Sequence, residues 1–259
     1  LDGNYPVGTG NVALGNTALD SVEAGGTYNV ALGDAAGTAI TTGDGNVGVG
    51  ADALLLNSSG GYNTALGTSS VRNNTTGNYN VGLGQGALYS NTTASNNTAV
   101  GYQALFDNTT AERNTAVGRL AAANTTTGAD NTAMGSAALT TNTTGATNIA
   151  IGASALRLNT TASNNTAVGF EAGYANTGDK NTFVGNEAGV ANTSGRLNTM
   201  LGRRAGKSNT TASSNTFVGQ ASGETNTTGQ YNTALGDQSL QSNTTASRNT
   251  AVGYQALYS

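Results

Sequence analysis

Side chains that commonly perform chemistry are scarce in this sequence of 259 residues. It contains no histidine and no cysteine, and only 14 acidic and 10 basic residues. General-base and nucleophilic catalysis draw mainly on histidine, cysteine and paired carboxylates. Acidic residues such as Asp34, Asp107, Glu171 and Asp237 stand at unrelated repeat positions or in isolated repeats. We therefore predict that the chain is not an enzyme and has no catalytic residues.

The same composition limits the ligands that the chain can bind. Without cysteine or histidine there is no thiolate or imidazole metal site, and the glycine- and aspartate-rich calcium repeat is missing, so we expect no metal and no cofactor. A formal charge of −4 gives no basic surface for nucleic acid. No apolar run approaches the ~20 residues of a membrane-spanning helix, so we expect no membrane insertion.

One motif recurs along almost the whole chain. Asn-Thr-Ala-Val-Gly, or a close variant, occurs fifteen times at intervals of 17 residues, apart from one interval of 18 and one of 16. A fixed period of this kind indicates coils that stack on one another. The opening asparagines are Asn11, Asn29, Asn46, Asn63, Asn80, Asn97, Asn114, Asn131, Asn148, Asn165, Asn181, Asn198, Asn215, Asn232 and Asn249.

The pattern inside each repeat predicts the fold. Counted from the asparagine, the second position is Thr, Val or Ile, the fourth is a large aliphatic residue and the fifth is Gly, which is typical of a short strand. We expect a second short strand at positions seven to nine and a turn at the Asn-Thr-Thr string. The prediction is an all-β parallel β-solenoid or β-roll of about fifteen 17-residue coils, with a degenerate first coil at 1–10 and a continuous array at 11–259.

The residues that every repeat keeps are interpreted as structural. Stacking places like residues ~4.8 Å apart, so the asparagines should form a hydrogen-bonded ladder, for which we single out Asn97, Asn114, Asn131, Asn148 and Asn165. The glycines should form a column where the chain needs a positive φ or a close approach. For that column we single out Gly101, Gly118, Gly135, Gly152 and Gly169.

The Asn-Thr-Thr strings also match the acceptor motif for N-linked glycosylation. Their loop position suits glycan attachment in a secreted protein, although turn chemistry explains the same string without glycans. Both readings stay open at this point. The candidate acceptors are Asn74, Asn91, Asn108, Asn142, Asn159, Asn209, Asn226 and Asn243.

Two features of the pattern concern packing. Side chains alternate across a strand, and neither face of the expected strand carries charge, so we expect one face inside the coil and the other against a partner. Positions three and nine compensate in size: the bulky Phe183, Met200 and Phe217 are each followed six residues later by glycine, whereas Ala is usually paired with Leu. In two repeats that break this rule, we expect Ile40 and Phe170 to fill the gap.

The repeat wording resembles that of known fibre proteins. The unit Asn-Thr-Ala-Val-Gly-Tyr-Gln-Ala-Leu at 97–105 and 249–257, joined by Asn-Thr-Thr-Ala-Ser, resembles repeats in the shafts of phage tail-fibre-like proteins. It resembles more loosely the head repeats of trimeric autotransporter adhesins, which are trimers of parallel β-rolls. The resemblance implies a homotrimer, an extracellular place on a virion or a cell surface, and no catalytic residues.

These observations lead to a structural function with two alternatives. We expect the shaft or stalk of an extracellular fibre, which binds copies of itself and holds a glycan- or receptor-binding tip that lies outside this segment. Because the motif runs to the last residues, we also expect the array to continue or to meet another subunit end to end. The alternatives are an ice-binding solenoid that uses the threonines at position two, and a carbohydrate-binding adhesin head.

Overall fold

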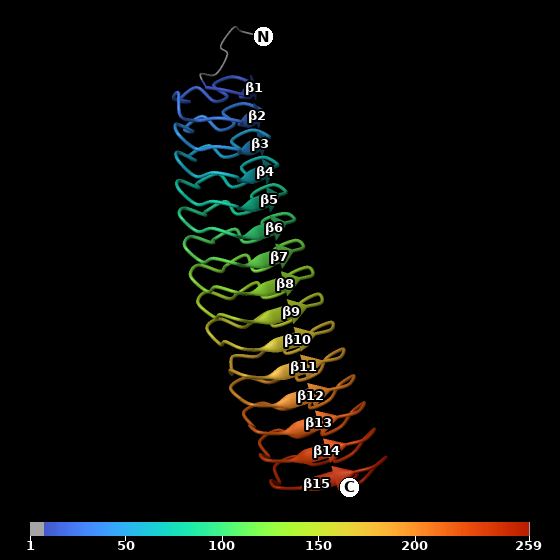
Figure 1. Cartoon of the computed structure of the whole chain (residues 1–259). Coiled ribbons are helices and arrows are strands. Elements are labelled where there is room, and N and C mark those ends of the chain that lie inside the picture. The colour runs from blue at the N-terminus through green and yellow to red at the C-terminus, as the bar shows by residue number, and fades with distance from the viewer. Residues whose placement is uncertain (1–7, 259) are drawn as a thin grey trace. The chain divides into compact units, whose positions relative to one another are not determined.

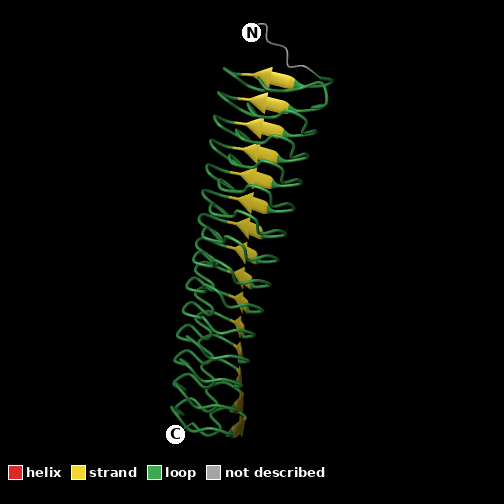
Figure 2. Ribbon diagram, turned by 90° about the vertical axis from the view of Figure 1, so that its left-hand side faces the viewer, coloured by secondary structure: helices red, strands yellow, loops and turns green. Residues whose placement is uncertain are grey.

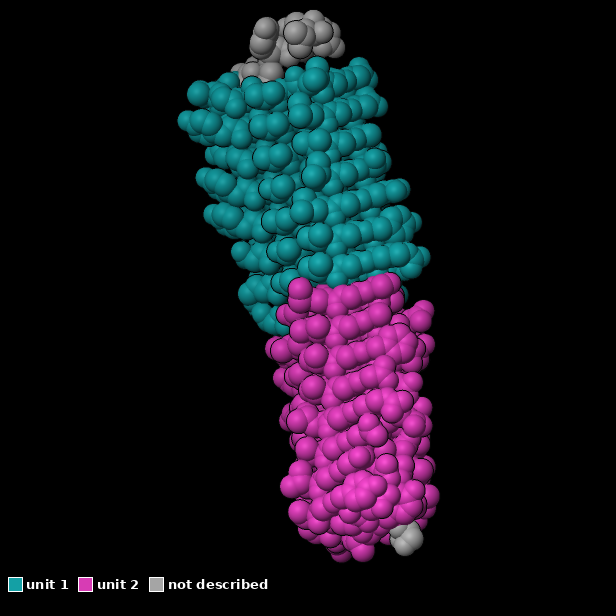
Figure 3. Space-filling view, turned by 90° about the vertical axis from the view of Figure 1, so that its right-hand side faces the viewer, with its two compact units in different colours: residues 1–130 teal, residues 131–259 magenta. Residues whose placement is uncertain are grey.

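The computed structural model describes residues 8–258, and within that range the protein is entirely β-structure and turn, with no helix. It divides into two compact units, residues 1–130 and 131–259, which Figure 3 shows in different colours. No change in the repeat motif marks this division. Most of the expected degenerate coil at 1–10 lies outside the described residues.

Each repeat contributes one strand of three residues, at the second to fourth repeat positions (Figure 1). The first unit contains β1 (Val12–Leu14), β2 (Val30–Leu32), β3 (Val47–Val49), β4 (Thr64–Leu66), β5 (Val81–Leu83), β6 (Thr98–Val100) and β7 (Thr115–Val117). The second unit contains β8 (Thr132–Met134), β9 (Ile149–Ile151), β10 (Thr166–Val168), β11 (Thr182–Val184), β12 (Thr199–Leu201), β13 (Thr216–Val218), β14 (Thr233–Leu235) and β15 (Thr250–Val252).

Within each unit, consecutive strands pair in parallel with like positions side by side. Thr98 pairs with Thr115, and the register is kept across the long interval, where Val12 pairs with Val30, and across the short one, where Thr166 pairs with Thr182. The length changes are therefore absorbed outside the strands. Figure 2 shows the strands along one side of the coils and loops around the rest. The predicted parallel β-solenoid is confirmed.

The strand has one buried face and one outward face. The middle residue of every strand from β2 to β15 is buried, whereas the first and third residues are half-buried or exposed. Leu66 is 50% exposed and Val252 is 64% exposed. The single chain therefore buries only one of the two uncharged faces. We call the first and third residues of the strands the outer sheet face.

The prediction of a second strand at positions seven to nine is wrong. Positions seven and nine have left-handed backbone conformations, as at Gln103 (φ 52°) and Leu105 (φ 49°), which an extended strand excludes. The segment still bonds to its neighbours: the N–H of Gln103 donates to Gln85 O and that of Leu105 to Ala121 O, each at 3.0 Å. These bonds run to opposite neighbouring coils, so stacking is kept without a strand.

The structure explains the size compensation between positions three and nine. A Cβ added to Gly223 would lie 2.7 Å from ring atoms of Phe217, and one added to Gly206 would lie 2.8 Å from Cε of Met200. The two positions therefore share one space inside the coil.

The two exceptions to this rule have different explanations. At Gly37, an added Cβ would meet Ile40 and Leu19, so the expectation for Ile40 is confirmed. The expectation for Phe170 is wrong, because that side chain is 49% exposed. The space beside Gly173 is filled by Phe183 of the following coil and by Leu156. Large core residues therefore also fill space between neighbouring coils.

Candidate functional site

The asparagine at position one forms a ladder inside the coils. The backbone N–H and the side-chain Nδ2 of Asn165 both donate to Oδ1 of Asn148, at 3.0 and 3.2 Å. Nδ2 of Asn148 donates to Ala162 O at 2.9 Å, three residues before its own coil closes on Asn165. A single buried amide thus joins two coils and also fixes the turn that precedes the next strand.

The structure places all five of the singled-out asparagines in this arrangement. Asn97, Asn114, Asn131, Asn148 and Asn165 are at most 1% exposed. Within the first unit the N–H of Asn114 donates to Oδ1 of Asn97 at 2.9 Å, and within the second unit Asn148 donates in the same way to Asn131. Buried polar groups must be hydrogen-bonded to avoid a large desolvation cost, and the ladder supplies these bonds.

The position-five glycines turn the chain where neighbouring coils come closest. Gly101, Gly118, Gly135, Gly152 and Gly169 all have φ between +127° and +135°. A Cβ on Gly152 would lie 2.6 Å from the carbonyl carbon of Gly169 in the next coil. Both the backbone conformation and the spacing therefore require glycine here.

A second asparagine ladder runs through position twelve, which the sequence analysis took only as a turn or a glycosylation site. Nδ2 of Asn74 donates to Oδ1 of Asn57 at 2.6 Å and to Gly77 O at 2.9 Å. Gly77 O also accepts from Asn63 of the first ladder, at 2.8 Å. The two ladders therefore hold the same turn carbonyl from two sides. The repetition of Asn at position twelve was the available signal.

This second ladder decides between the two readings of the Asn-Thr-Thr strings. A glycan would replace an amide hydrogen used in the ladder and would have to fit inside the coil, so we interpret these asparagines as structural. The amide groups of Asn74, Asn91, Asn108, Asn142, Asn159, Asn209 and Asn226 are fully buried, and that of Asn243 is partly buried.

Two further sets of side-chain bonds join successive coils. The threonine at position thirteen donates to the backbone of its counterpart in the next coil, as Thr75 Oγ1 does to Thr92 O at 3.0 Å. At position sixteen, Oγ of Ser95 accepts from the N–H of Asn78 at 3.0 Å. Every part of the Asn-Thr-Thr-Ala-Ser string is thus explained by contacts inside the array.

The second ladder is interrupted where threonine replaces asparagine. Thr125 occupies position twelve of its coil and is fully buried, while the neighbouring Asn124 is exposed. Oδ1 of Asn108 and Oγ1 of Thr125 have no hydrogen-bond partner. A buried polar atom without a partner costs roughly 1–3 kcal/mol.

Replacing Thr125 by asparagine should therefore stabilise the protein. The new Nδ2 would donate to Oδ1 of Asn108, and we expect the free energy of unfolding to rise by roughly 1–3 kcal/mol. Urea unfolding followed by circular dichroism measures this change. The matched control is Thr127→Asn, which adds the same group at an exposed position and should change little. A variant Thr125→Asn no more stable than the wild type would contradict the assignment.

Ionisable residues gather on coils β11 to β14. Lys207 Nζ lies 2.7 Å from Oε2 of Glu187, and Nη2 of Arg204 lies 2.6 Å from Oε1 of Glu224. The hydrogen bond from Lys207, followed by its charge and those of Arg204 and Arg203, lowers the pKa of Glu187 below its ordinary value of 4.5. No group of three or more potential metal-ligating side chains occurs among residues 8–258.

This lowered pKa predicts a contribution of Glu187 to stability that depends on pH. The contribution is complete above pH 4.5, the ordinary pKa of the group, and is lost as the pH falls through the lower folded-state pKa. The variant Lys207→Met should therefore lose less thermal stability than the wild type between pH 7 and pH 3. Melting temperatures at the two pH values measure the difference, and equal losses would show that the pair does not contribute.

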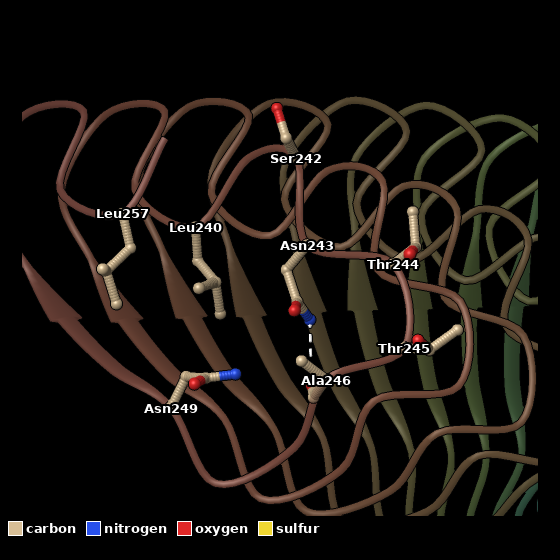
Figure 4. Close-up of a pocket in the computed structure, with 8 residues that line it drawn as sticks. All are labelled: Leu240, Ser242, Asn243, Thr244, Thr245, Ala246, Asn249 and Leu257. Atoms are coloured by element: carbon tan, nitrogen blue, oxygen red, sulfur yellow. Dashed lines mark hydrogen bonds between the residues drawn. The ribbon is translucent and has the colours of Figure 1, made fainter. Parts of the chain in front are cut away.

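A recess of ~340 Å³ lies at the last described coils, as Figure 4 shows. Its lining includes Leu240, Asn243, Asn249 and Leu257. These residues occupy positions nine, twelve and one of the repeat, which form the interior columns of the other coils. We therefore interpret the recess as exposed coil interior and assign it no ligand.

The outer sheet face is the main surface that the ladders leave for contact with other molecules. None of its residues is charged. Large apolar side chains on it are well exposed, including Leu14 at 56%, Leu66 at 50% and Leu235 at 48%. Contiguous exposed apolar surface commonly marks an interaction site.

A search of the described residues finds no helix long and apolar enough to cross a membrane. Comparison with known proteins finds no match to any family model, curated protein or solved structure.

Proposed function

We propose that the chain is a non-catalytic shaft segment of an extracellular fibre on a virion or a cell surface, and that copies of the chain assemble along their outer sheet faces. The observation that carries the proposal is the uncharged, exposed outer sheet face, repeated in every coil. A strand exposed to water normally carries polar side chains on that face. A partner that covers this face would remove the aliphatic residues from water.

The interior of one coil supports the need for a partner. Its core consists mainly of alanine at positions three and eight and one leucine at position nine, together with the buried asparagines. Alanine contributes little apolar area, whereas ordering a residue costs about 1–2 kcal/mol. Burial of the outer leucines and valines between copies would add to this thin core.

The number of copies rests on the resemblance to fibre and adhesin repeats. We propose three parallel chains, with the outer sheet faces around a common axis. In this arrangement like coils lie at the same height, so each outer residue meets its counterparts. The glycan- or receptor-binding role of a tip outside this segment belongs to the same proposal.

Disulfide cross-linking tests this arrangement, because the natural chain contains no cysteine. Leu66→Cys places a thiol on the outer sheet face, and Thr93→Cys places one at an exposed turn position as a control. Mild oxidation should link Leu66→Cys chains into covalent dimers and leave Thr93→Cys chains unlinked. Equal linking of both variants, or none of Leu66→Cys, would contradict assembly through this face.

One observation favours ice binding as a second candidate. In the second unit, threonines such as Thr182, Thr199 and Thr216 lie one coil apart at position two of a parallel sheet, and they point outward. The sequence analysis counted the exchange of Thr with Val and Ile as a sign of burial, but the column lies on the outer sheet face. A thermal-hysteresis assay separates the candidates: the shaft predicts no hysteresis, whereas hysteresis abolished by Thr199→Tyr would favour ice binding.

A further inference from the structure

The outer sheet face changes in character along the chain. In β1 to β5, the second and fourth repeat positions are aliphatic in every strand except for Thr64. From β6 to β15, the second position is threonine in every strand except for Ile149. The first five coils therefore present two apolar columns, whereas the later coils present one apolar and one hydroxyl column.

The position just before each asparagine changes in the same way. Next to β2, β4 and β5 it holds Tyr28, Tyr62 and Tyr79, which are 59–66% exposed. The rings of Tyr62 and Tyr79 stack at 5.3 Å between centroids. In later coils this position is often charged, as at Arg113, Asp130, Lys180 and Arg248.

Symmetry makes this difference important for self-association. Parallel copies around an axis bring each residue close to its own counterpart in the other copies. Charged residues beside such an axis would face like charges, whereas aliphatic and tyrosine side chains pack against themselves. The cores of protein interfaces are accordingly depleted of charge and enriched in tyrosine.

We propose that the outer residues of β1 to β5, together with Tyr28, Tyr62 and Tyr79, form the main self-association surface of the chain. The occupant is the same set of coils in a second copy, because identical coil spacing lets the two apolar columns match along their length. This inference rests on the proposed assembly through the outer sheet face and locates it in the first five coils. The later coils contribute little to the affinity between copies.

The test compares two leucines that differ mainly in their place along the chain. Leu66 in β4 and Leu235 in β14 occupy the same repeat position and are 50% and 48% exposed. Leu66→Lys and Leu235→Lys are made in the full chain, and association is measured by analytical ultracentrifugation over a series of concentrations. Far-UV circular dichroism of each variant establishes that the coils remain folded.

We expect Leu66→Lys to weaken association by about tenfold or more, since an unpaired charge would be buried between copies. Leu235→Lys should weaken association by less than about twofold. Tyr62→Ser introduces no charge and should weaken association in the same direction as Leu66→Lys.

Equal weakening by both lysine variants would overturn this inference and leave assembly through the outer sheet face intact. No effect of either variant on an oligomeric wild type would overturn both the inference and the use of this face. A wild type that is monomeric at all concentrations would show that the proposed assembly itself is wrong.

Discussion

Replacing Asn148 by alanine should lower the free energy of unfolding by roughly 2–6 kcal/mol. Oδ1 of Asn148 accepts from both the backbone N–H and Nδ2 of Asn165, and both donors are buried. The variant leaves these two groups without their acceptor, and each such loss costs about 1–3 kcal/mol. Urea unfolding gives the overall change, and hydrogen exchange at the amide of Asn165 reports the loss locally.

The matched control makes the same chemical change on the surface. Asn186 in the same unit is exposed and occupies position six of its coil. Asn186→Ala should therefore change stability by no more than about 0.5 kcal/mol. Similar effects of the two alanine variants would show that the buried ladder is not a principal source of stability.

The second large effect is expected when the shared space between positions three and nine is overfilled. Gly223→Leu should destabilise by roughly 1–3 kcal/mol, because the new side chain would overlap the ring of Phe217. The backbone does not forbid leucine there, since Leu105 holds the same repeat position at φ 49° and Gly223 has φ 58°. The cost therefore reports overpacking.

A second substitution should reverse much of this loss. Adding Phe217→Ala recreates the pairing of Ala99 with Leu105, both of which are fully buried. Recovery should be incomplete, because Phe217 also contacts the space beside Gly206. Thermal unfolding of the single and double variants measures the recovery, with the exposed substitution Gln220→Leu as a size control. A double variant less stable than Gly223→Leu alone would contradict the shared-space model.

The features of the fold that follow from periodicity could be predicted from the sequence. A period of 17 residues, β-branched residues at position two and an unvarying glycine indicated parallel coils, and the strands occupy those positions. The compensation between Phe217 and Gly223 could be found because both vary together between repeats. These signals are visible because fifteen copies of the same unit sample one environment.

The conformation at positions seven to nine could not be predicted in the same way. Leucine at positive φ, as at Leu105, is unfavourable in isolation, and only bonds to both neighbouring coils hold it there. The second ladder was missed for a different reason. Its asparagine lies in a string that also reads as a turn and a glycosylation motif, and burial of Asn74 is visible only in three dimensions.

The mass of the intact particle tests the central claim most directly. Copies that cover one another's outer sheet faces should give a particle of three times the chain mass of 25.6 kDa. Native mass spectrometry or light scattering at micromolar concentration measures this, with circular dichroism to establish that the β-structure is intact. The account predicts a trimer, and a folded particle of 25.6 kDa would show that a single chain is stable with its outer sheet face in water.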